Sequence, residues 1–463
     1  MAPRITIVGG GSTHWTPRLL VDFANTPSLQ DARVVLMDVD PESLPPMVEV
    51  AQHIAGRRGI GLDVEATTDL AASLDGAEFV ITALTVGGFA SMRHDLEIPA
   101  RHGIRQPVGD SVGPGGISRA LRSVPVVVGI AREMERRCPD ALLVNVSNPL
   151  SALCRAVGRE TSIRAVGLCN EVVGLQFVLS LLFDADLRGI DPVVAGVNHL
   201  PLVTGLRIGE RDGFAALSEL LDRYAAEPEG LAQEKIWMAP PDGMHWHKVT
   251  AGAEWTKADV IANVPIRLEL FRRFGVLPGA SDTHVAEFFP FFVTEASDFG
   301  REWGVHHYGL AGHQADKDED DAGVRELLAA DEISTWPSGE LVAAVLDGIV
   351  TGDGHPLPVN LPNTGQVENL PPDVVVECMG VPGTGGVQAR DRVTVPGVLG
   401  EWLRRVAASE ELTVEAAVSG SHDAALAAML ADPMTSRLPY EDVVAMTGEL
   451  LSATARWLPQ FGG

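Results

Sequence analysis

Short apolar runs alternate with amphipathic stretches along the first third of the chain. The runs that we expect to be strands are residues 5–9, 33–37, 79–82 and 142–145. The stretches between them predict helices near residues 17–24, 44–57 and 117–137. Repeated strand-helix units predict a parallel sheet with helices on both faces. Strand-like segments at residues 165–168 and 193–197 extend the pattern, so we expect an α/β fold with a Rossmann-like, doubly wound sheet over residues 1–197.

The pattern changes after about residue 200. We expect helices at residues 214–224 and 264–274, a turn-rich segment at 275–290, a strand at 374–377 and helices from residue 398 onward. The acidic run 316–321 predicts a solvated loop or the start of a helix, because like charges repel and stay hydrated. With neither a repeat nor a low-complexity linker in the sequence, residues 198–463 predict a second, mixed α/β domain that shares a large interface with the first.

The charge balance excludes several classes of partner. The 463 residues include 62 acidic and 35 basic side chains, a formal net charge of −27. Nucleic-acid binding and attachment to anionic lipid both need a basic surface, so we expect neither. A single anionic small molecule can still bind in one local basic pocket.

Membrane insertion and secretion are also not expected. No apolar run approaches the roughly 20 residues that a membrane helix needs, and the first residues show no secretory signal pattern. Four widely spaced cysteines do not predict a disulfide framework. We therefore expect a reduced, cytoplasmic protein.

A glycine-rich segment, VGGGSTH at residues 8–14, follows the first strand and opens a helix. Bare backbone and a helix N-terminus at this position suit a pyrophosphate, which makes Gly9, Gly11, Ser12 and Thr13 candidate dinucleotide contacts. Asp38 ends the next strand, where a carboxylate accepts from ribose hydroxyls and repels a 2′-phosphate, favouring NAD over NADP. A tight strand-helix turn without a ligand is the alternative, since His14 replaces the third glycine of the usual pattern.

Two further segments lie where a parallel sheet binds ligands. GDSVGPGG at residues 109–116 could bring bare backbone close to a sugar or a flat ring, but taken alone the segment favours a helix-capping turn. NVSNP at residues 145–149 directly follows an apolar strand and places Asn148 over the crevice, with an Asn-Pro turn as the alternative.

Potential metal and sugar ligands follow later strands. Cys169-Asn170-Glu171 and Asn198-His199 each come after a short strand, so a thiolate and an imidazole could share a divalent ion; a buried cysteine and a core histidine are the alternative. Residues 279–290, with Asp282, His284 and several aromatic side chains, suit a sugar site or a loop that caps an aromatic core.

Taken in order, these segments resemble the NAD-dependent glycoside hydrolases of family 4 and their close relatives. The segments that carry the resemblance are ITIVGGGSTHWTPRLL, LTVGGFASMRHDLEIP, GDSVGPGG, NVSNP, GLCNEV, GVNHL, RLELFRRFG, GASDTHVAEFFP and NLPPDVVVE. The resemblance implies that bound NAD⁺ oxidises the sugar at C3, which acidifies the proton at C2. A base then removes that proton, the aglycone leaves from C1, water adds and the hydride returns.

The resemblance also implies roles for individual residues. It places a divalent cation, usually Mn²⁺, on Cys169 and His199, and sugar contacts at Arg93, Asn148 and Asn170. Glu171 and His284 join them as candidate substrate contacts. Asn170 is also a candidate catalytic residue, and Asn148 a candidate contact of the NAD. Many relatives use a tyrosine as the C2 base, but this chain has no tyrosine at residues 225–307, so Asp259 or Asp282 is expected instead.

The substrate is expected to be a glycoside of an anionic sugar. Position 283 is Thr where related sequences often carry a basic residue, which argues against a 6-phosphosugar. The segment containing His245, Trp246 and Lys248 is basic and aromatic, which favours a C6 carboxylate (a uronoside) or a C6 sulfonate (a sulfoquinovoside).

Three alternatives stay open at this point: a 6-phosphoglycosidase of the same family, an NAD-dependent 2-hydroxy-acid dehydrogenase, and a non-catalytic sugar sensor. The resemblance further implies a homodimer or homotetramer.

Overall fold

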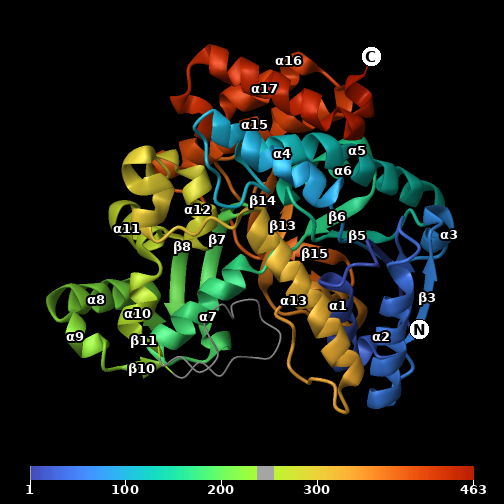
Figure 1. Cartoon of the computed structure of the whole chain (residues 1–463). Coiled ribbons are helices and arrows are strands. Elements are labelled where there is room, and N and C mark those ends of the chain that lie inside the picture. The colour runs from blue at the N-terminus through green and yellow to red at the C-terminus, as the bar shows by residue number, and fades with distance from the viewer. Residues whose placement is uncertain (1, 237–254, 463) are drawn as a thin grey trace.

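The computed structural model describes residues 2–236 and 255–462. One 13-stranded sheet runs through the molecule in the order β12-β8-β7-β14-β13-β6-β5-β4-β1-β2-β3, with β15 beside β14 and β9 beside β8. Figure 1 shows helices on both sides of this sheet, with the N-terminal strands at one end and β7 and β8 toward the other. The expected α/β fold with a Rossmann-like first half is therefore confirmed.

The first six strands form the parallel part of the sheet, in the order β3-β2-β1-β4-β5-β6. They are β1 (Arg4–Val8), β2 (Arg33–Met37), β3 (Asp63–Thr67), β4 (Phe79–Thr82), β5 (Leu142–Asn145) and β6 (Arg164–Gly167). The central β4 and β5 are buried throughout, as expected for strands covered on both faces. Sequence reasoning missed β3, because DVEAT is an exposed edge strand with little apolar character.

Helices cover the parallel strands on both faces. They are α1 (Trp15–Asn25), α2 (Leu44–Arg58), α3 (Leu70–Leu74), α4 (Gly88–Arg101), α5 (Gly113–Arg137), α6 (Leu150–Glu160) and α7 (Glu171–Phe183). The C-terminal helices α15 (Gly397–Ser419), α16 (His422–Ala431) and α17 (Tyr440–Thr454) pack over α4, α5 and α6, at the top of Figure 1. The beginning and end of the chain are thus joined in one folded body.

The second half of the sheet is antiparallel. Its main strands are β7 (Ile190–Val197), β8 (Leu200–Ile208), β12 (Leu277–Pro278), β13 (Leu357–Pro362) and β14 (Val375–Gly383), with β9 (Arg211–Asp212) and β15 (Gly386–Ala389) at their sides. β13 joins the two halves by pairing Asn360 with Gly167 of β6. The expected boundary after residue 197 falls at the turn between β7 and β8, and the division into two domains stays a prediction.

The antiparallel strands are flanked by α8 (Gly213–Ala226), α9 (Pro228–Leu231), α10 (Lys257–Ala262), α11 (Pro265–Phe274) and α12 (Asp282–Phe288). Two more helices contact the first half of the fold: α13 (Gly309–Ala329) packs against α2 and α4, and α14 (Val342–Thr351) packs against α1 as well as β14. A separate two-stranded sheet pairs β10 (Lys235–Ile236) with β11 (Trp255–Thr256). Residues 282–288, expected to be turn-rich, form α12.

The acidic run 316–321 is neither a loop nor the start of a helix, because it lies inside α13. Asp320 is nearly buried there, with 7% of its side chain exposed, since it is paired with His14 and Arg18 of the first βα unit. The expected solvated surface is confirmed for Lys317, Asp318 and Glu319, which are exposed. Asp320 departs from it because basic partners from a distant part of the sequence compensate its charge.

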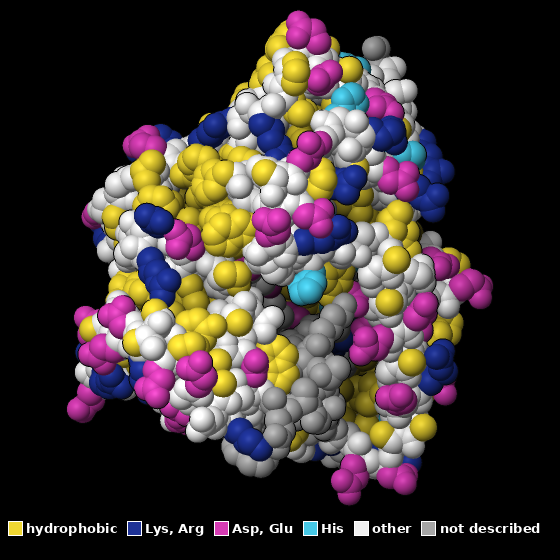
Figure 2. Space-filling view, turned by 60° about the vertical axis from the view of Figure 1, so that its left-hand side comes forward, with side chains coloured by type: hydrophobic (Ala, Val, Ile, Leu, Met, Phe, Trp, Pro, Cys, Tyr) yellow, Lys and Arg dark blue, Asp and Glu magenta, His cyan; other side chains and the backbone are white. Residues whose placement is uncertain are grey.

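The surface reflects the acidic composition without one dominant charged patch. Figure 2 shows acidic side chains scattered over the visible face and interspersed with lysine and arginine, while hydrophobic side chains gather at its upper left. Among the described residues, no helix has the length and apolar content to cross a membrane.

Candidate active site

A tight glycine turn joins β1 to α1 at the carboxyl end of the parallel strands. The backbone N–H groups of Gly9 and Gly10 both donate to the Met37 carbonyl, at 2.9 Å each. Gly9 has a φ of +95°, and a Cβ there would lie 2.1 Å from the carbonyl oxygen of Ala83. The turn therefore requires bare backbone, and it begins α1 beside the crevice where open α/β sheets bind their ligands.

Asp38 follows β2 and contacts the same turn. Its Oδ2 accepts from the N–H of Gly11 at 3.0 Å, and its Oδ1 accepts from the N–H of Asp40 at 3.1 Å. A Cβ on Gly11 would lie 1.9 Å from Oγ of Ser43, so a larger residue does not fit. Each carboxylate oxygen keeps a second lone pair, so Asp38 can still accept from a ribose hydroxyl.

Helix α13 contacts the residues that follow the glycine turn. Oγ1 of Thr13 donates to Asp321 at 2.8 Å, and Nδ1 of His14 lies 2.9 Å from Asp320. Arg18 donates to the other oxygen of Asp320 at 3.0 Å. Burial opposes ionisation of Asp320, but His14 and Arg18 outweigh burial and lower its pKa to about 2. The carboxylate is therefore charged at neutral pH and connects α13 to the candidate dinucleotide site.

A second group of polar side chains contains Asp110, His199 and His284. One potential ligand atom of each lies within 4.8 Å of the others. Asp110 comes from the loop before α5, His199 from the turn between β7 and β8, and His284 from α12. The two imidazole rings have centroids 3.8 Å apart. Segments far apart in the sequence thus form one site.

Hydrogen bonds determine the tautomer of His199. Oγ of Ser111 donates to Oδ1 of Asp110 at 2.9 Å and lies 2.8 Å from Nδ1 of His199. Because the hydroxyl proton points to Asp110, Nδ1 of His199 donates to the serine oxygen, and Nε2 keeps its lone pair. Burial, helped by the nearby His284, lowers the pKa of His199 to about 4, so the ring is neutral at pH 7.

Glu171 and His284 form the second pair of the cluster. Nε2 of His284 lies 4.0 Å from Oε1 of Glu171, whose Oε2 accepts from the backbone N–H of Ser281. Burial of Glu171 opposes its ionisation, but the charges of His284, His199 and Arg267 hold its pKa below the ordinary value. Nδ1 of His284 is buried and has no hydrogen-bond partner among the described residues.

Asn148 and Arg119 support Asp110 from the side of the parallel sheet. Nδ2 of Asn148 donates to Oδ2 of Asp110 at 2.8 Å, and Nε of Arg119 donates to the Asn148 carbonyl at 3.1 Å. Asp110 is buried, which opposes its ionisation, yet His199, His284 and Arg119 together hold its pKa well below the usual range. Asp110 is therefore an anion in the centre of the cluster.

Cys169, expected as a metal ligand, and Asn170, expected to contact the sugar, have different surroundings. Cys169 is not part of the three-residue group, although Glu171 and Asn198 are among its neighbours; burial, with the charges of Glu377 and Glu171, raises the pKa of its thiol. Asn170 donates to Glu340 at 3.2 Å, and burial raises the pKa of Glu340 to about 7.

Neither carboxylate expected as the C2 base lies in the cluster. Asp259 is exposed and caps α10 through Thr256. Asp282 is buried in an ion pair with Arg267 and also accepts from the N–H of Ile266 at 2.7 Å, so its carboxylate is part of a buried ion pair outside the cluster.

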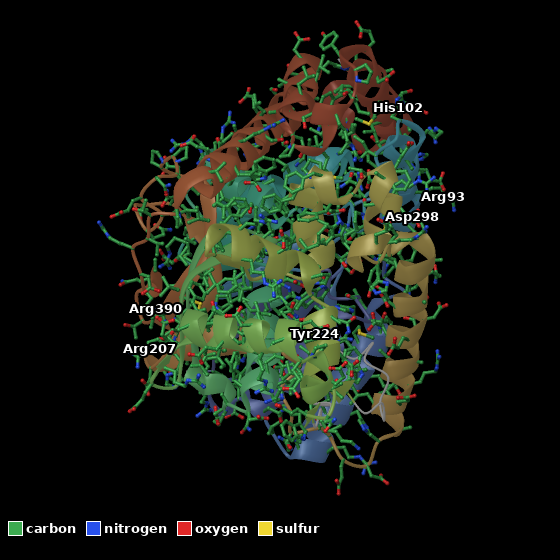
Figure 3. The ribbon with its side chains drawn as sticks, turned by 90° about the vertical axis from the view of Figure 1, so that its left-hand side faces the viewer. Arg93, His102, Arg207, Tyr224, Asp298 and Arg390 are labelled. Atoms are coloured by element: carbon green, nitrogen blue, oxygen red, sulfur yellow. The ribbon has the colours of Figure 1, made fainter. Side chains whose placement is uncertain are left out.

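Other expected substrate contacts are placed elsewhere or lie outside the described residues. Arg93 is exposed on α4, and Figure 3 shows it at the edge of the molecule. His245, Trp246 and Lys248 fall within residues 237–254, which the structure does not describe.

Asp110, Ser111 and Glu287 are the site residues that sequence reasoning missed. GDSVGPGG was interpreted mainly as a capping turn, but its aspartate and serine set the tautomer of His199. Glu287 accepts from the backbone N–H groups of Val108 and Gly109 at 2.9 and 2.8 Å, and so holds the segment before Asp110. The only signal in the sequence was the position of these polar residues within glycine- and phenylalanine-rich segments.

The donors of the cluster fit a divalent cation. A carboxylate oxygen and imidazole nitrogens are ligands that Mn²⁺ accepts, and a neutral His199 with a free Nε2 is in the required protonation state. The glycine turn with Asp38 likewise fits a dinucleotide, because the turn carries no side chains at the positions where a pyrophosphate would approach the protein backbone.

Known proteins with similar sequences are glycosidases. This chain is 29% identical to an alpha-galactosidase of Bacillus subtilis (strain 168) over 469 residues, which cover 99% of each protein. It is 27% identical to an alpha-galacturonidase of Thermoanaerobacterium saccharolyticum, over 98% of this chain and 96% of that protein.

Solved structures share the fold. A putative glucosidase of Bacillus subtilis superposes with a TM-score of 0.83 at 26% identity, over 97% of this chain and all of that one. A 6-phospho-alpha-glucosidase from gut microorganisms, solved with NAD and Mn²⁺, has a TM-score of 0.79 at 21% identity, over 99% of this chain and all of that one.

Residues 4–184 match the family 4 glycosyl hydrolase model, and residues 194–435 match the C-terminal domain of family 4 glycosyl hydrolases. The two matches follow each other in the order of the sequence and together span most of the chain. With its glycine turn and its buried cluster of aspartate and histidines, the chain belongs to the family 4 glycosyl hydrolases and is a glycosidase.

Proposed function

We propose that this glycosidase uses NAD⁺ as a catalytic cofactor and acts on a glycoside whose sugar carries a carboxylate at C6, with an α-galacturonide as the first candidate. The observation that carries the proposal is the pairing of a dinucleotide-type glycine turn with the Asp110–His199–His284 cluster in one chain. The related alpha-galacturonidase and alpha-galactosidase support the choice of a galacto-configured sugar.

Gly9, Gly11, Ser12, Thr13 and Asp38 would hold the dinucleotide, while His199 and Asp110 would hold a divalent cation. When bound, these groups supply a reversible oxidation at C3 of the sugar and polarisation of the oxygen formed there. The hydrogen bond of Asn148 to Asp110 also brings that amide to the sugar site. The part that Cys169 plays in binding the cation stays a prediction.

The residues of the chain handle the protons. We assign the C2 proton to the His284–Glu171 pair, because Nδ1 of His284 is free to accept it and the anionic Glu171 stabilises the imidazolium that forms. This pair replaces the tyrosine that many relatives use. We do not assign this role to Asp282, because its carboxylate is held in a buried ion pair with Arg267.

Two arginines can recognise a C6 carboxylate. The positive charge of Arg119 helps to lower the pKa of Asp110, and that of Arg267 helps to lower the pKa of Glu171. Both cations therefore border the cluster. Arg119 donates to two neutral groups, a carbonyl and a hydroxyl, whereas Arg267 already forms an ion pair with Asp282. We therefore expect Arg119 to contribute more to the selection of an anionic sugar.

A panel of nitrophenyl glycosides tests the proposal: α-galacturonide, α-galactoside, glucuronide, sulfoquinovoside and 6-phosphoglucoside, each assayed with and without NAD⁺ and Mn²⁺. The expected result is NAD⁺-dependent release of nitrophenol, fastest with the α-galacturonide and without net NADH. Preference for the sulfoquinovoside or the 6-phosphoglucoside would contradict the carboxylate. Stoichiometric NADH on a 2-hydroxy acid, with no glycoside cleaved, would instead indicate a dehydrogenase.

A further inference from the structure

Asn198 and His199 form the two-residue turn between β7 and β8, because Val197 and Leu200 are directly paired on either side. His199 has a φ of +65°, in the left-handed region that favours glycine. The second residue of such a turn is usually Gly or Asn, since a Cβ crowds the neighbouring carbonyl. The chain thus keeps a strained histidine at the point where its imidazole joins the cluster.

Glu377 lies in the middle of the sheet, beside this turn. Its strand, β14, pairs Glu377 with Gly196 of β7 on one side and with Asn360 of β13 on the other. The carboxyl is completely buried and accepts from Nδ2 of Asn198 at 3.3 Å. Burial raises the pKa of Glu377 to about 8, although the Asn198 side chain and the backbone N–H of His199 both favour its charged form. Both residues of the turn therefore interact with the same carboxyl.

This buried carboxyl is not explained by stability alone. Among the described residues, Oε1 of Glu377 and Oδ1 of Asn198 have no hydrogen-bond partner. A polar group buried without full compensation costs folding free energy, and apolar residues are the usual occupants of a central strand covered on both faces. A glutamate at this place indicates a role in the arrangement of the turn.

We propose that Glu377 is a positioning residue that holds the Asn198–His199 turn in its strained conformation and so directs the His199 imidazole toward Ser111. The Asn198 side chain transmits this effect, and the backbone N–H of Asn198 is held from the other side by Oγ of Ser151 at 3.3 Å. The inference rests on the proposed function only where it treats His199 as a metal ligand.

Histidine NMR tests the positioning without metal, cofactor or substrate. In protein labelled with ¹⁵N-histidine, a His199→Gln variant identifies the His199 signals, which should show one tautomer with the proton on Nδ1. Glu377→Gln keeps an acceptor oxygen of the same reach and should retain that tautomer. Glu377→Ala should give averaged tautomer signals. A single Nδ1–H tautomer in folded Glu377→Ala would overturn the proposal.

Manganese titration, followed by the EPR signal of free Mn²⁺, gives the second measurement. Glu377→Ala should weaken Mn²⁺ binding at least tenfold, and Glu377→Gln by less than threefold. Val376→Ala, a buried change on the same strand, is the control for lost stability and should leave Mn²⁺ binding unchanged. Equal weakening in Val376→Ala and Glu377→Ala at matched melting temperatures would contradict the proposal. Absence of Mn²⁺ binding by the wild-type protein would count against the proposed function, while the NMR result would still decide the role of Glu377.

Discussion

Oγ of Ser111 lies 2.8 Å from Nδ1 of His199, and this contact joins two segments 88 residues apart in the sequence. The Ser111 hydroxyl donates its hydrogen bond to Asp110, so His199 must donate through Nδ1 and keeps the lone pair of Nε2 for a ligand. The tautomer of the histidine is therefore set by a serine in a segment whose sequence indicates no more than a helix start.

Replacing Ser111 by alanine should weaken Mn²⁺ binding and lower kcat/KM by about tenfold to a hundredfold, because the His199 ring loses the acceptor that orients it. Titration with Mn²⁺ and initial rates on the preferred glycoside measure both effects. Ser123→Ala is a matched control, since Ser123 is buried on α5 and its hydroxyl has no hydrogen-bond partner among the described residues. Unchanged Mn²⁺ affinity in Ser111→Ala would contradict the assigned role.

Asp38 should determine the choice between NAD and NADP. Its carboxylate repels a 2′-phosphate, so Asp38→Ala should weaken NAD binding by about tenfold and reduce the discrimination against NADP. Calorimetric titration of both dinucleotides gives the ratio of dissociation constants. Asp40→Asn, a change at the exposed neighbouring carboxylate, is the control and should leave the ratio as it is. If loss of the Asp38 carboxylate left this ratio unchanged, Asp38 would not be the residue that contacts the adenosine ribose of the dinucleotide.

Asp320 should make the stability of the fold depend on acid. Its pKa, about 2 in the folded state against 3.8 ordinarily, means that the ion pair stabilises the protein above pH 4 and is lost as the pH falls toward 2. Wild-type protein should therefore lose about 2 kcal/mol of unfolding free energy from this group over that interval, and Asp320→Asn should lack this part of the slope. Urea unfolding at several pH values measures it.

Asp318→Asn is the control for this prediction, because Asp318 lies on the same helix with an exposed hydrogen bond to Gln314. A pH slope that is the same in Asp320→Asn as in the wild-type protein would show that the contact between α13 and α1 does not contribute.

His284 and Glu171 should control proton removal at C2. His284→Gln should abolish exchange of the C2 proton with solvent, and Glu171→Gln should lower the exchange rate by about a hundredfold, because the imidazolium loses its anionic partner. Mass spectrometry of sugar incubated in D₂O with NAD⁺ follows the exchange. An Asp259→Asn variant should exchange at the wild-type rate, since that carboxylate caps an exposed helix. Full exchange in His284→Gln would show that a residue other than His284 removes the C2 proton.

Local patterns predicted the parallel half of the fold well. The strands at residues 33–37, 79–82 and 142–145 have the expected bounds. Each is a short, continuous apolar run between amphipathic helices, which is the pattern of a strand buried on both faces. Prediction was poorer where distant segments decide the structure. Asp320 of α13 forms an almost buried contact because His14 and Arg18, about 300 positions away in the sequence, pair with it.

The same limit applies to the site. Glycines 9 and 11, Asp38, Asn148 and His199 could be proposed because each directly follows a predicted strand, and parallel strands end at one edge of a sheet. Asp259 and Asp282 were proposed from the resemblance, as carboxylates in the segment after His199 that lacks a tyrosine, and the structure uses the first as a helix cap and the second as the partner of a buried arginine. Ser111 and Glu287 act through hydrogen bonds to segments distant in the sequence, which no local spacing encodes.

The most direct test of the central claim is hydrolysis of the α-galacturonide in D₂O, with the purified protein, NAD⁺ and Mn²⁺. The proposed function predicts that the released sugar carries deuterium at C2, that NADH does not accumulate, and that omission of NAD⁺ stops the reaction. Cleavage at the same rate without the dinucleotide, or product without deuterium at C2, would contradict it.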